Sequence, residues 1–317
     1  MRLSHLTQRG RRFAPAALLV TACFAVSGCT FSAEPKQPDQ STGVVEMGQP
    51  VSEKNRTQWS LPLEEFIVYS PELSNYAEQL LISKCLTGQG YEWPVPWRDS
   101  AFLWPEGFNK IGYRLFDEPL AKRFGYHFAP PRDANEADAW AAFADFANSY
   151  TPDDDFTGKF EECSDEARSE KTVRDVDAQN YVMGLAMQAS DVAVQDASVQ
   201  EAVARWRECL TPKVDFAVSD TPWKQMPPQA VAERFGLYGE SRTMAASGDE
   251  IAVAVADAQC RESSGVSETR YNLEWDQQKK LMDQNRDQLD RIRAEAGAHK
   301  KDLLAIIAEN APAAPMG

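Results

Sequence analysis

The chain has 317 residues and carries 48 Asp and Glu against 33 Lys and Arg, for a formal net charge of −15. This acidic balance excludes a nucleic acid partner, because binding a phosphate backbone requires a basic surface. The length allows one large or two small hydrophobic cores.

The first 28 residues are typical of a bacterial export signal. Four arginines precede residue 13, and the first acid of the chain is Glu34. An apolar run of 14 residues follows, from Phe13 to Val26. A membrane-spanning helix needs about 20 apolar residues, so this run predicts a cleaved signal peptide, residues 1–28, and not a permanent anchor.

The signal ends in Val26-Ser27-Gly28-Cys29, which resembles the lipobox of bacterial lipoproteins. The resemblance implies that the Cys29 thiol receives diacylglycerol and becomes the first residue of the mature chain. We therefore expect this lipid to hold the protein on the outer face of the cytoplasmic membrane, facing the cell wall. Because the signal removes four arginines and no acid, the mature chain would carry 29 basic against 48 acidic residues, a net charge of −19.

Residues 29–60 are rich in Pro, Gln, Ser, Thr and charged residues, and they contain few apolar ones. Such a composition cannot bury enough apolar surface to fold by itself. It predicts a flexible, lipidated tether, and a chain of about 30 residues in this regime spans roughly 30 Å.

From residue 61 onward, apolar residues recur at helical spacing. Ser70-Pro71 is typical of a helix start, and Gly88 is typical of a helix end. Further helices are predicted over residues 156–163 and 181–194 and after Asp133, Ser198 and Ser247. Strand-like alternation is scarce, so the predicted class is mainly α.

Two stretches of the sequence are repeated. Lys84-Cys85-Leu86-Thr87 is similar to Glu208-Cys209-Leu210-Thr211, and Ala121-Lys122-Arg123-Phe124-Gly125 is similar to Ala232-Glu233-Arg234-Phe235-Gly236. Each copy then reaches a helix with a second cysteine, Cys163 or Cys260. Similar elements in a fixed order indicate a duplication. We predict two repeated helical units, residues 61–195 and 196–265.

Four cysteines remain once the signal is removed and Cys29 carries the lipid. An even number in an exported protein predicts disulfides. Of the three possible pairings, only Cys85–Cys163 with Cys209–Cys260 keeps each bridge within one repeat, and we expect that pairing. Zinc is disfavoured, since the chain has no Cys-x-x-Cys motif and its mature part has only two histidines.

These features resemble a family of uncharacterised exported lipoproteins from actinobacteria, in which a helix ends in Cys-Met or Cys-Leu before Gly-Tyr and an Ala-Asp-x-x-Cys motif follows later. The matching residues here are Cys85-Leu86 with Gly90-Tyr91, Cys209-Leu210, and Ala256-Asp257-Ala258-Gln259-Cys260. The second copy departs from the pattern, having Pro212-Lys213-Val214-Asp215-Phe216 in place of the glycine. The resemblance spans residues 60–300 and implies an accessory role beside export components, with no activity attached.

Aromatic residues are dense between residues 91 and 116, and they include Tyr91, Trp93, Trp97 and Trp104. Rings in such a loop either pack on the helices beneath it or form an exposed stacking surface. In the second case these four residues would be a ligand surface for a sugar or a peptide.

Candidate catalytic and metal sites are weak. His127 and His299 are the histidines of the mature chain, and the sequence has no Gly-x-Ser-x-Gly motif to accompany them. The segment 153–158 resembles the start of an EF-hand loop, but the twelfth position is Ser164 instead of glutamate. We therefore predict no catalytic residue, no metal and no cofactor.

The C-terminal segment, residues 266–310, predicts one long helix with a coiled-coil-like seam. Its apolar residues follow alternating steps of four and three, and they include Tyr271, Trp275, Met282, Leu289, Ile292 and Leu303. This 3.5-residue period is the pattern of a coiled-coil seam. The seam either folds back on the protein's own helices or pairs with a second copy or an envelope partner, with Gln278 and Asn285 setting the register.

The sequence thus predicts a membrane-anchored, non-enzymatic interaction or accessory protein of the cell envelope, whose partner surface is the C-terminal helix. The alternative is a binding module that takes a cell-wall glycan or a small ligand through residues 91–116.

Overall fold

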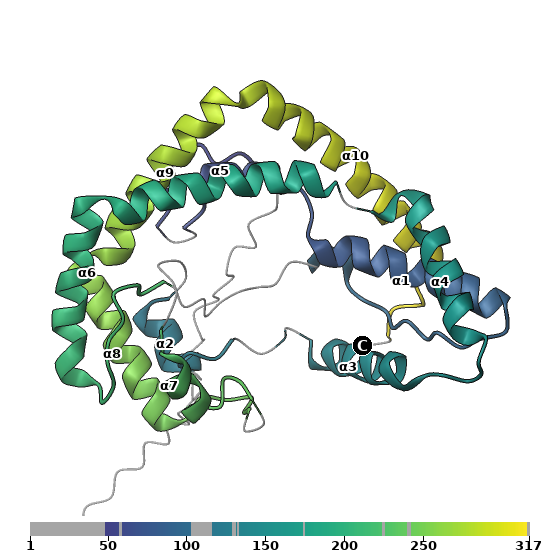
Figure 1. Ribbon diagram of the computed structural model, residues 1–317, viewed down its shortest axis with the longest axis horizontal. Coiled ribbons are helices and arrows are strands. Elements are labelled where there is room, and N and C mark those ends of the chain that lie inside the picture. The colour runs from purple at the N-terminus through teal and green to yellow at the C-terminus, as the bar shows by residue number, and fades with distance from the viewer. Residues whose placement is uncertain are drawn as a thin grey trace, which may run out of the picture. The chain divides into compact units, whose positions relative to one another are not determined.

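The computed structural model describes residues 48–56, 59–102, 116–128, 131, 133–173, 175–223, 226–239 and 242–315 (Figure 1). The predicted signal peptide, Cys29 and Trp104 lie outside these residues. Within them the secondary structure is helical and includes no strand, which confirms the mainly α class. None of the described helices is both long and apolar enough to cross a membrane.

The α-helices of the described residues are α1 (Pro71–Gly88), α2 (Glu118–Phe124), α3 (Ala134–Ser149), α4 (Phe156–Ala167), α5 (Val176–Gln195), α6 (Ala197–Leu210), α7 (Gln229–Arg234), α8 (Gly248–Ser264), α9 (Val266–Gln284) and α10 (Arg286–Asn310). Short helical turns lie between them: η1 (Pro62–Phe66), η2 (Ser100–Phe102), η3 (Arg168–Thr172) and η4 (Thr211–Lys213).

Short polar side chains cap the starts of several helices. The Asp133 carboxylate accepts hydrogen bonds from two backbone N–H groups of α3, and Ser247 Oγ accepts one from the Glu250 N–H at the start of α8, where the sequence predicts a cap. The cap predicted at Ser198 lies elsewhere. Asp196 accepts the Ser198 N–H, so α6 begins at Ala197.

The first hydrophobic core joins α1, α3 and α4 with the end of α10. Its buried members include Tyr76, Leu86, Trp93, Phe143, Phe156, Cys163, Leu303 and Ile307. Four of the buried side chains are aromatic, and the ring centroids of Trp93 and Phe143 lie 5.6 Å apart in an edge-to-face arrangement. Two residues of the last helix, Leu303 and Ile307, complete this core.

The second core joins α2, α6, α7 and α8, with Trp206 fully buried among them. It contains both copies of the repeated Ala-x-Arg-Phe-Gly motif, because Ala121 lies in it beside Phe235. Each copy ends in a glycine with positive φ, +58° at Gly125 and +71° at Gly236. Residues 116–126, expected in the unit 61–195, therefore pack with helices of the unit 196–265.

The predicted C-terminal helix is divided in two. The helix breaks at Asn285, which has φ −119°, and the Asn285 side chain donates to the Leu281 carbonyl oxygen at 2.7 Å. The Tyr181 hydroxyl of α5 donates to Asn285 Oδ1 at 2.7 Å. A tertiary contact thus holds the break, and α9 and α10 are separate helices.

The C-terminal seam packs on the protein's own chain. Its buried members are Tyr271, Met282, Leu289, Ile292 and Leu303, while Trp275 is half-buried. Met282, Leu289 and Ile292 form a third core with η1 and α5. The fold-back alternative is the one observed, and the protein's own helices cover the five buried side chains.

The described part of the predicted tether is packed, not free. The Asn55 N–H donates to the Tyr271 hydroxyl at 2.9 Å, and that hydroxyl donates to the Ser60 carbonyl at 2.8 Å. Lys54 forms an ion pair with Asp276 at 2.7 Å. The expectation of a flexible segment up to residue 60 is therefore wrong for residues 48–56 and 59–60, because ring and ion-pair contacts with α9 hold them.

Candidate functional site

The structure has two disulfides, and the pairing is the predicted one. Cys85 of α1 is bonded to Cys163 of α4, and Cys209 of α6 is bonded to Cys260 of α8, each with a Cα–Cα distance of 5.6 Å. In both copies the residue four positions after the first cysteine lies against both sulfurs. Gln89 does so in the first copy, at 3.5 and 3.4 Å.

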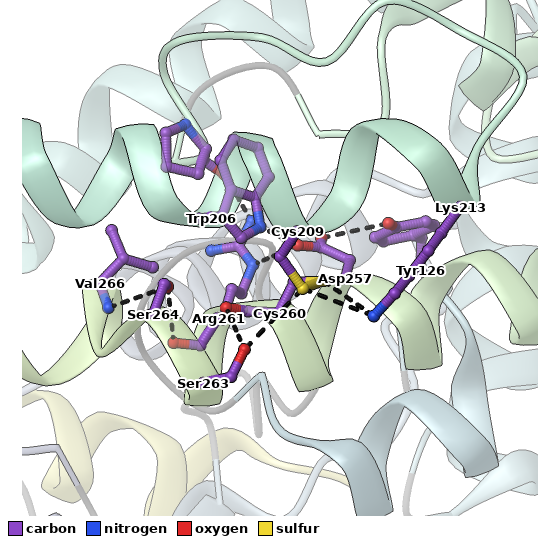
Figure 2. Close-up of polar contacts among 11 residues, drawn as sticks. Tyr126, Trp206, Cys209, Lys213, Asp257, Cys260, Arg261, Ser263, Ser264 and Val266 are labelled. Carbon is purple, nitrogen blue, oxygen red and sulfur yellow. Dashed lines mark hydrogen bonds and ion pairs between the residues drawn. A yellow bond between two sulfur atoms is a disulfide. The ribbon is translucent and has the colours of Figure 1, made fainter.

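Lys213 takes the same place in the second copy, with Nζ 3.4 Å from both sulfurs. Beside this disulfide lies a buried polar network (Figure 2). Asp257 Oδ1 accepts from Trp206 Nε1 and from Arg261 Nε, both at 2.8 Å, while Asp257 Oδ2 accepts from the Tyr126 hydroxyl at 3.1 Å. Burial, reinforced by the Asp257 carboxylate, raises the pKa of Tyr126 well above its usual 10.0.

This network is closed to solvent. Asp257 is 0 % exposed and Arg261 is 2 % exposed, and Arg261 Nη2 also donates to the Pro222 carbonyl at 2.7 Å. A ligand has no access to such a site without opening the core. We assign the network a structural role, tying α2 and α6 to α8.

A second polar group joins α2 to the loop before α8. Glu250 Oε1 lies 2.8 Å from His127 Nδ1 and accepts the Tyr126 N–H at 2.7 Å. His127 Nε2 lies 3.1 Å from Thr243 Oγ1, but that hydroxyl donates to the Ala245 carbonyl. These contacts tie the residues that follow α2 to α8 and to the loop before it.

Of the four residues predicted as a ligand surface between residues 91 and 116, one is buried, two are half-buried and Trp104 lies outside the described residues. Trp93 is buried in the first core, and its Nε1 donates to Gln79 Oε1 at 2.9 Å. Tyr91 and Trp97 are half-buried, and the Tyr91 ring contacts Phe156. The rings of Tyr91 and Trp93 thus pack on the helices beneath the loop.

A pocket lies between η1, α5 and α10, and we call it the α5–α10 pocket. Three segments distant in sequence line it, residues 66–69, 173–183 and 292–299. Its volume is about 240 Å³. The apolar part of its lining includes Phe66, Val68, Val182, Met183, Ile292 and Ala296.

The charged residues among the described lining of this pocket are Asp175 and Glu295, both acidic. The Asp175 carboxylate also caps α5, accepting the Ala178 N–H at 2.9 Å. His299 contributes a buried Nε2 that has no hydrogen-bond partner among the described residues. Burial lowers the pKa of His299 below 6.5, against the opposing effect of Asp302, so the imidazole is uncharged at neutral pH.

Exposed apolar side chains include two of the pocket lining, Val173 and Met183, and two further residues of α5, Val176 and Met187. Val173, Val176, Met183 and Met187, which we call the apolar strip, are 55, 51, 45 and 63 % exposed. Val176, Met183 and Met187 lie on one face of α5, since steps of seven and four residues return to the same side of a helix. Grouped exposed apolar residues on a folded protein mark an interaction site.

The sequence contains one sign of this strip. Apolar residues of α5 occupy more than one face, with Val182 and Ala189 buried while Met183 and Met187 are exposed. A helix that needs only one covered face would have polar residues at the last two positions.

No protein family, curated protein or solved structure matches this chain. Among the described residues, no three His, Cys, Asp or Glu side chains are grouped so that they could hold a metal ion. The pocket and the apolar strip are therefore the features from which a function is argued.

Proposed function

We propose that this chain is a lipid-anchored protein of the cell envelope that acts without catalysis, by binding another protein through the α5–α10 pocket and the apolar strip. Two features support the location outside the cytoplasm. The N-terminal pattern that ends at Cys29 is that of an exported lipoprotein, and two disulfides suit an oxidising compartment.

The observation that carries the proposal is the continuity of the pocket with the strip. Val173 and Met183 belong to both, so a partner that covers the strip reaches the pocket as well. Methionine suits this use because its unbranched side chain adapts to different partner surfaces. Covering these side chains removes apolar surface from water, which drives association.

A small apolar ligand is the second candidate, favoured by the cavity itself. Its volume of about 240 Å³ lies just below the usual range for ligand pockets, roughly 300–1,000 Å³. The exposed strip outside the cavity favours a protein, because a small ligand would leave Met187 uncovered. The glycan alternative is weakened, because the Trp93 ring is buried and a sugar cannot stack on it.

The test is cross-linking and co-purification of the tagged, full-length protein from intact cells. Ala296→Phe would fill the pocket, and Ala294→Phe, at an exposed position of the same helix, is the matched control. We expect the envelope protein that co-purifies with the natural chain and with Ala294→Phe to be absent with Ala296→Phe. Equal recovery from both variants would contradict the pocket as the binding site.

The anchor has its own test. Cys29→Ser should leave an unlipidated precursor or release the protein from the membrane fraction, because the acceptor thiol is gone. A variant that stays membrane-bound and normally processed would overturn the lipid anchor.

A further inference from the structure

We infer that the occupant of the α5–α10 pocket is a basic amphipathic segment of the partner protein, with apolar side chains in the pocket and Lys or Arg against Glu295 and Asp175. This inference rests on the proposed function and names the chemistry of the partner. It follows from the size of the pocket, the charges beside it and the charge of the whole chain.

The size of the pocket favours side chains over a complete ligand. A cavity of about 240 Å³ has room for the apolar anchor residues of a peptide. The wall formed by α5 includes Met183 and continues about one turn further to the exposed Met187, which gives a further anchor an apolar surface. An amphipathic helix laid on a groove uses anchors at this spacing.

Two carboxylates flank the apolar lining from different elements. Glu295 lies on α10, is exposed, and has no hydrogen bond or ion pair with any described residue. Asp175 lies at the start of α5, where Asp177 follows in the first turn. Asp175 and Asp177 together more than offset the partial positive charge at the N-terminus of α5, which is equivalent to about half a unit charge.

The acids select against anionic and neutral partners. An acidic segment would be repelled by Glu295, and a neutral one would cover the carboxylates without pairing them. A lysine or arginine beside the anchor residues pairs with them instead. The net charge of −15 extends the same preference over long range and speeds association with a basic segment.

His299 does not oppose this choice. Its imidazole lines the pocket and is neutral at neutral pH, so it adds no positive charge that would repel a basic segment. The aromatic ring of Tyr69 covers one side of the imidazole, with ring centroids 5.2 Å apart.

The experiment uses the chain from residue 30 on, which contains every described residue, and isothermal titration calorimetry. The probes are two amphipathic peptides of roughly 14 residues with the same leucine pattern, one with lysines and the other with glutamates at its polar positions. Four protein variants are compared: Glu295→Gln with its control Asp287→Asn, an exposed acid of α10 outside the pocket, and Ala296→Phe with its control Ala294→Phe.

We expect the Leu/Lys peptide to bind and the Leu/Glu peptide to bind at least about tenfold more weakly. Glu295→Gln should lower the affinity for the Leu/Lys peptide by about two- to fivefold, as is typical of one exposed charge at an interface. Asp287→Asn should leave this affinity unchanged. Ala296→Phe should lower the affinity for the Leu/Lys peptide by about tenfold or more, and Ala294→Phe should not change it.

Different failures have different meanings. If both peptides bind equally and Ala296→Phe weakens both, the pocket remains the binding site and the basic partner is overturned. If Ala296→Phe changes the binding of neither peptide, the pocket is not the binding site and the proposed function fails. If the natural chain sediments as a dimer and Ala296→Phe as a monomer, a second copy occupies the pocket, which also overturns the inference.

Discussion

The two disulfide-linked helix pairs, α1 with α4 and α6 with α8, share sequence motifs, but different kinds of side chain form their cores. Both have a Cys-Leu-Thr helix end and a polar side chain, Gln89 or Lys213, against the two sulfurs. The first pair is closed by aromatic rings around Trp93. The second is closed around a buried ion pair, Asp257 with Arg261 at 2.8 Å.

The two pairs also depend on different distant segments. The first is completed by Leu303 and Ile307 of α10, and the second by Phe116 and Ala121 from the chain before α2 and from α2 itself. The comparison teaches that a repeated motif specifies the helix pair and its disulfide, while residues outside the motif decide the chemistry of the core. The predictions below test this division.

The largest effect is expected from removing α10 by ending the chain at Asn285. This deletes Leu303 and Ile307 from the first core and Leu289 and Ile292 from the third, each a loss of about 2–5 kcal/mol as a single alanine substitution. The four losses add up to about 8–20 kcal/mol, comparable to the usual total stability of about 5–15 kcal/mol, and they fall on the first and third cores and not on the second. Hydrogen exchange should show α1 losing protection while α6 and α8 keep theirs. Retained protection in α1 would show that the first pair does not need α10.

Removing the buried carboxylate should affect the second pair strongly. Asp257→Ala leaves Arg261 charged in the core and deprives Trp206 and Tyr126 of their acceptor, for a loss of about 3–5 kcal/mol in the free energy of unfolding. Asp215→Ala, which breaks the exposed ion pair with Arg234, is the control and should change nothing measurable. Denaturant unfolding measures both, and equal midpoints for the two variants would contradict a core built on the ion pair.

The disulfides should contribute nearly equally despite the different cores. Replacing Cys85 and Cys163 by alanine should cost about 2–4 kcal/mol, and replacing Cys209 and Cys260 should cost a few tenths less. The reason is that separations of 78 and 51 residues differ little in the logarithm that sets loop entropy. Chemical denaturation of both double variants is the measurement. A difference of several kcal/mol would mean that a bridge is needed by one core and not by the other.

A small, pH-dependent effect is expected at His299, one turn before Leu303 on α10. Burial lowers the pKa of this imidazole in the folded state below 6.5, so the unfolded state takes up the proton first as the pH falls. The resulting stability is therefore fully present above about pH 6.5 and declines as the pH falls through the folded-state pKa. His299→Gln should show a shallower loss of stability than the natural chain over this interval. Parallel curves would mean that His299 is not desolvated in the folded protein.

Local patterns in the sequence predict much of the fold. Helical spacing and capping residues predict most helices, and the repeat predicts both disulfides because each bridge joins helices of one copy. Local patterns do not show which helices pack against one another. The motif at Ala121 matches the one at Ala232, so spacing alone does not reveal that both pack in one core. The break at Asn285 depends on Tyr181, more than a hundred residues away.

Local sequence patterns do not predict the pocket, for the same reason. Its lining comes from residues 66–69, 173–183 and 292–299, and none of these segments has a pattern that points to the others. The exposed Met183 and Met187 were visible in principle, as apolar residues on a second face of α5. Seam residues such as Leu289 predict a partner surface, but the protein's own helices satisfy a seam pattern equally well.

Site-specific photo-cross-linking in living cells tests the binding surface most directly. A photoreactive residue replaces Met187 in the full-length lipidated chain, and the same residue at Met244, another exposed methionine outside the apolar strip, is the control. We expect an adduct with one envelope protein from position 187 and not from position 244, abolished by Ala296→Phe and kept in Ala294→Phe. An adduct that forms equally from both positions, or that survives Ala296→Phe, would contradict binding through the α5–α10 pocket.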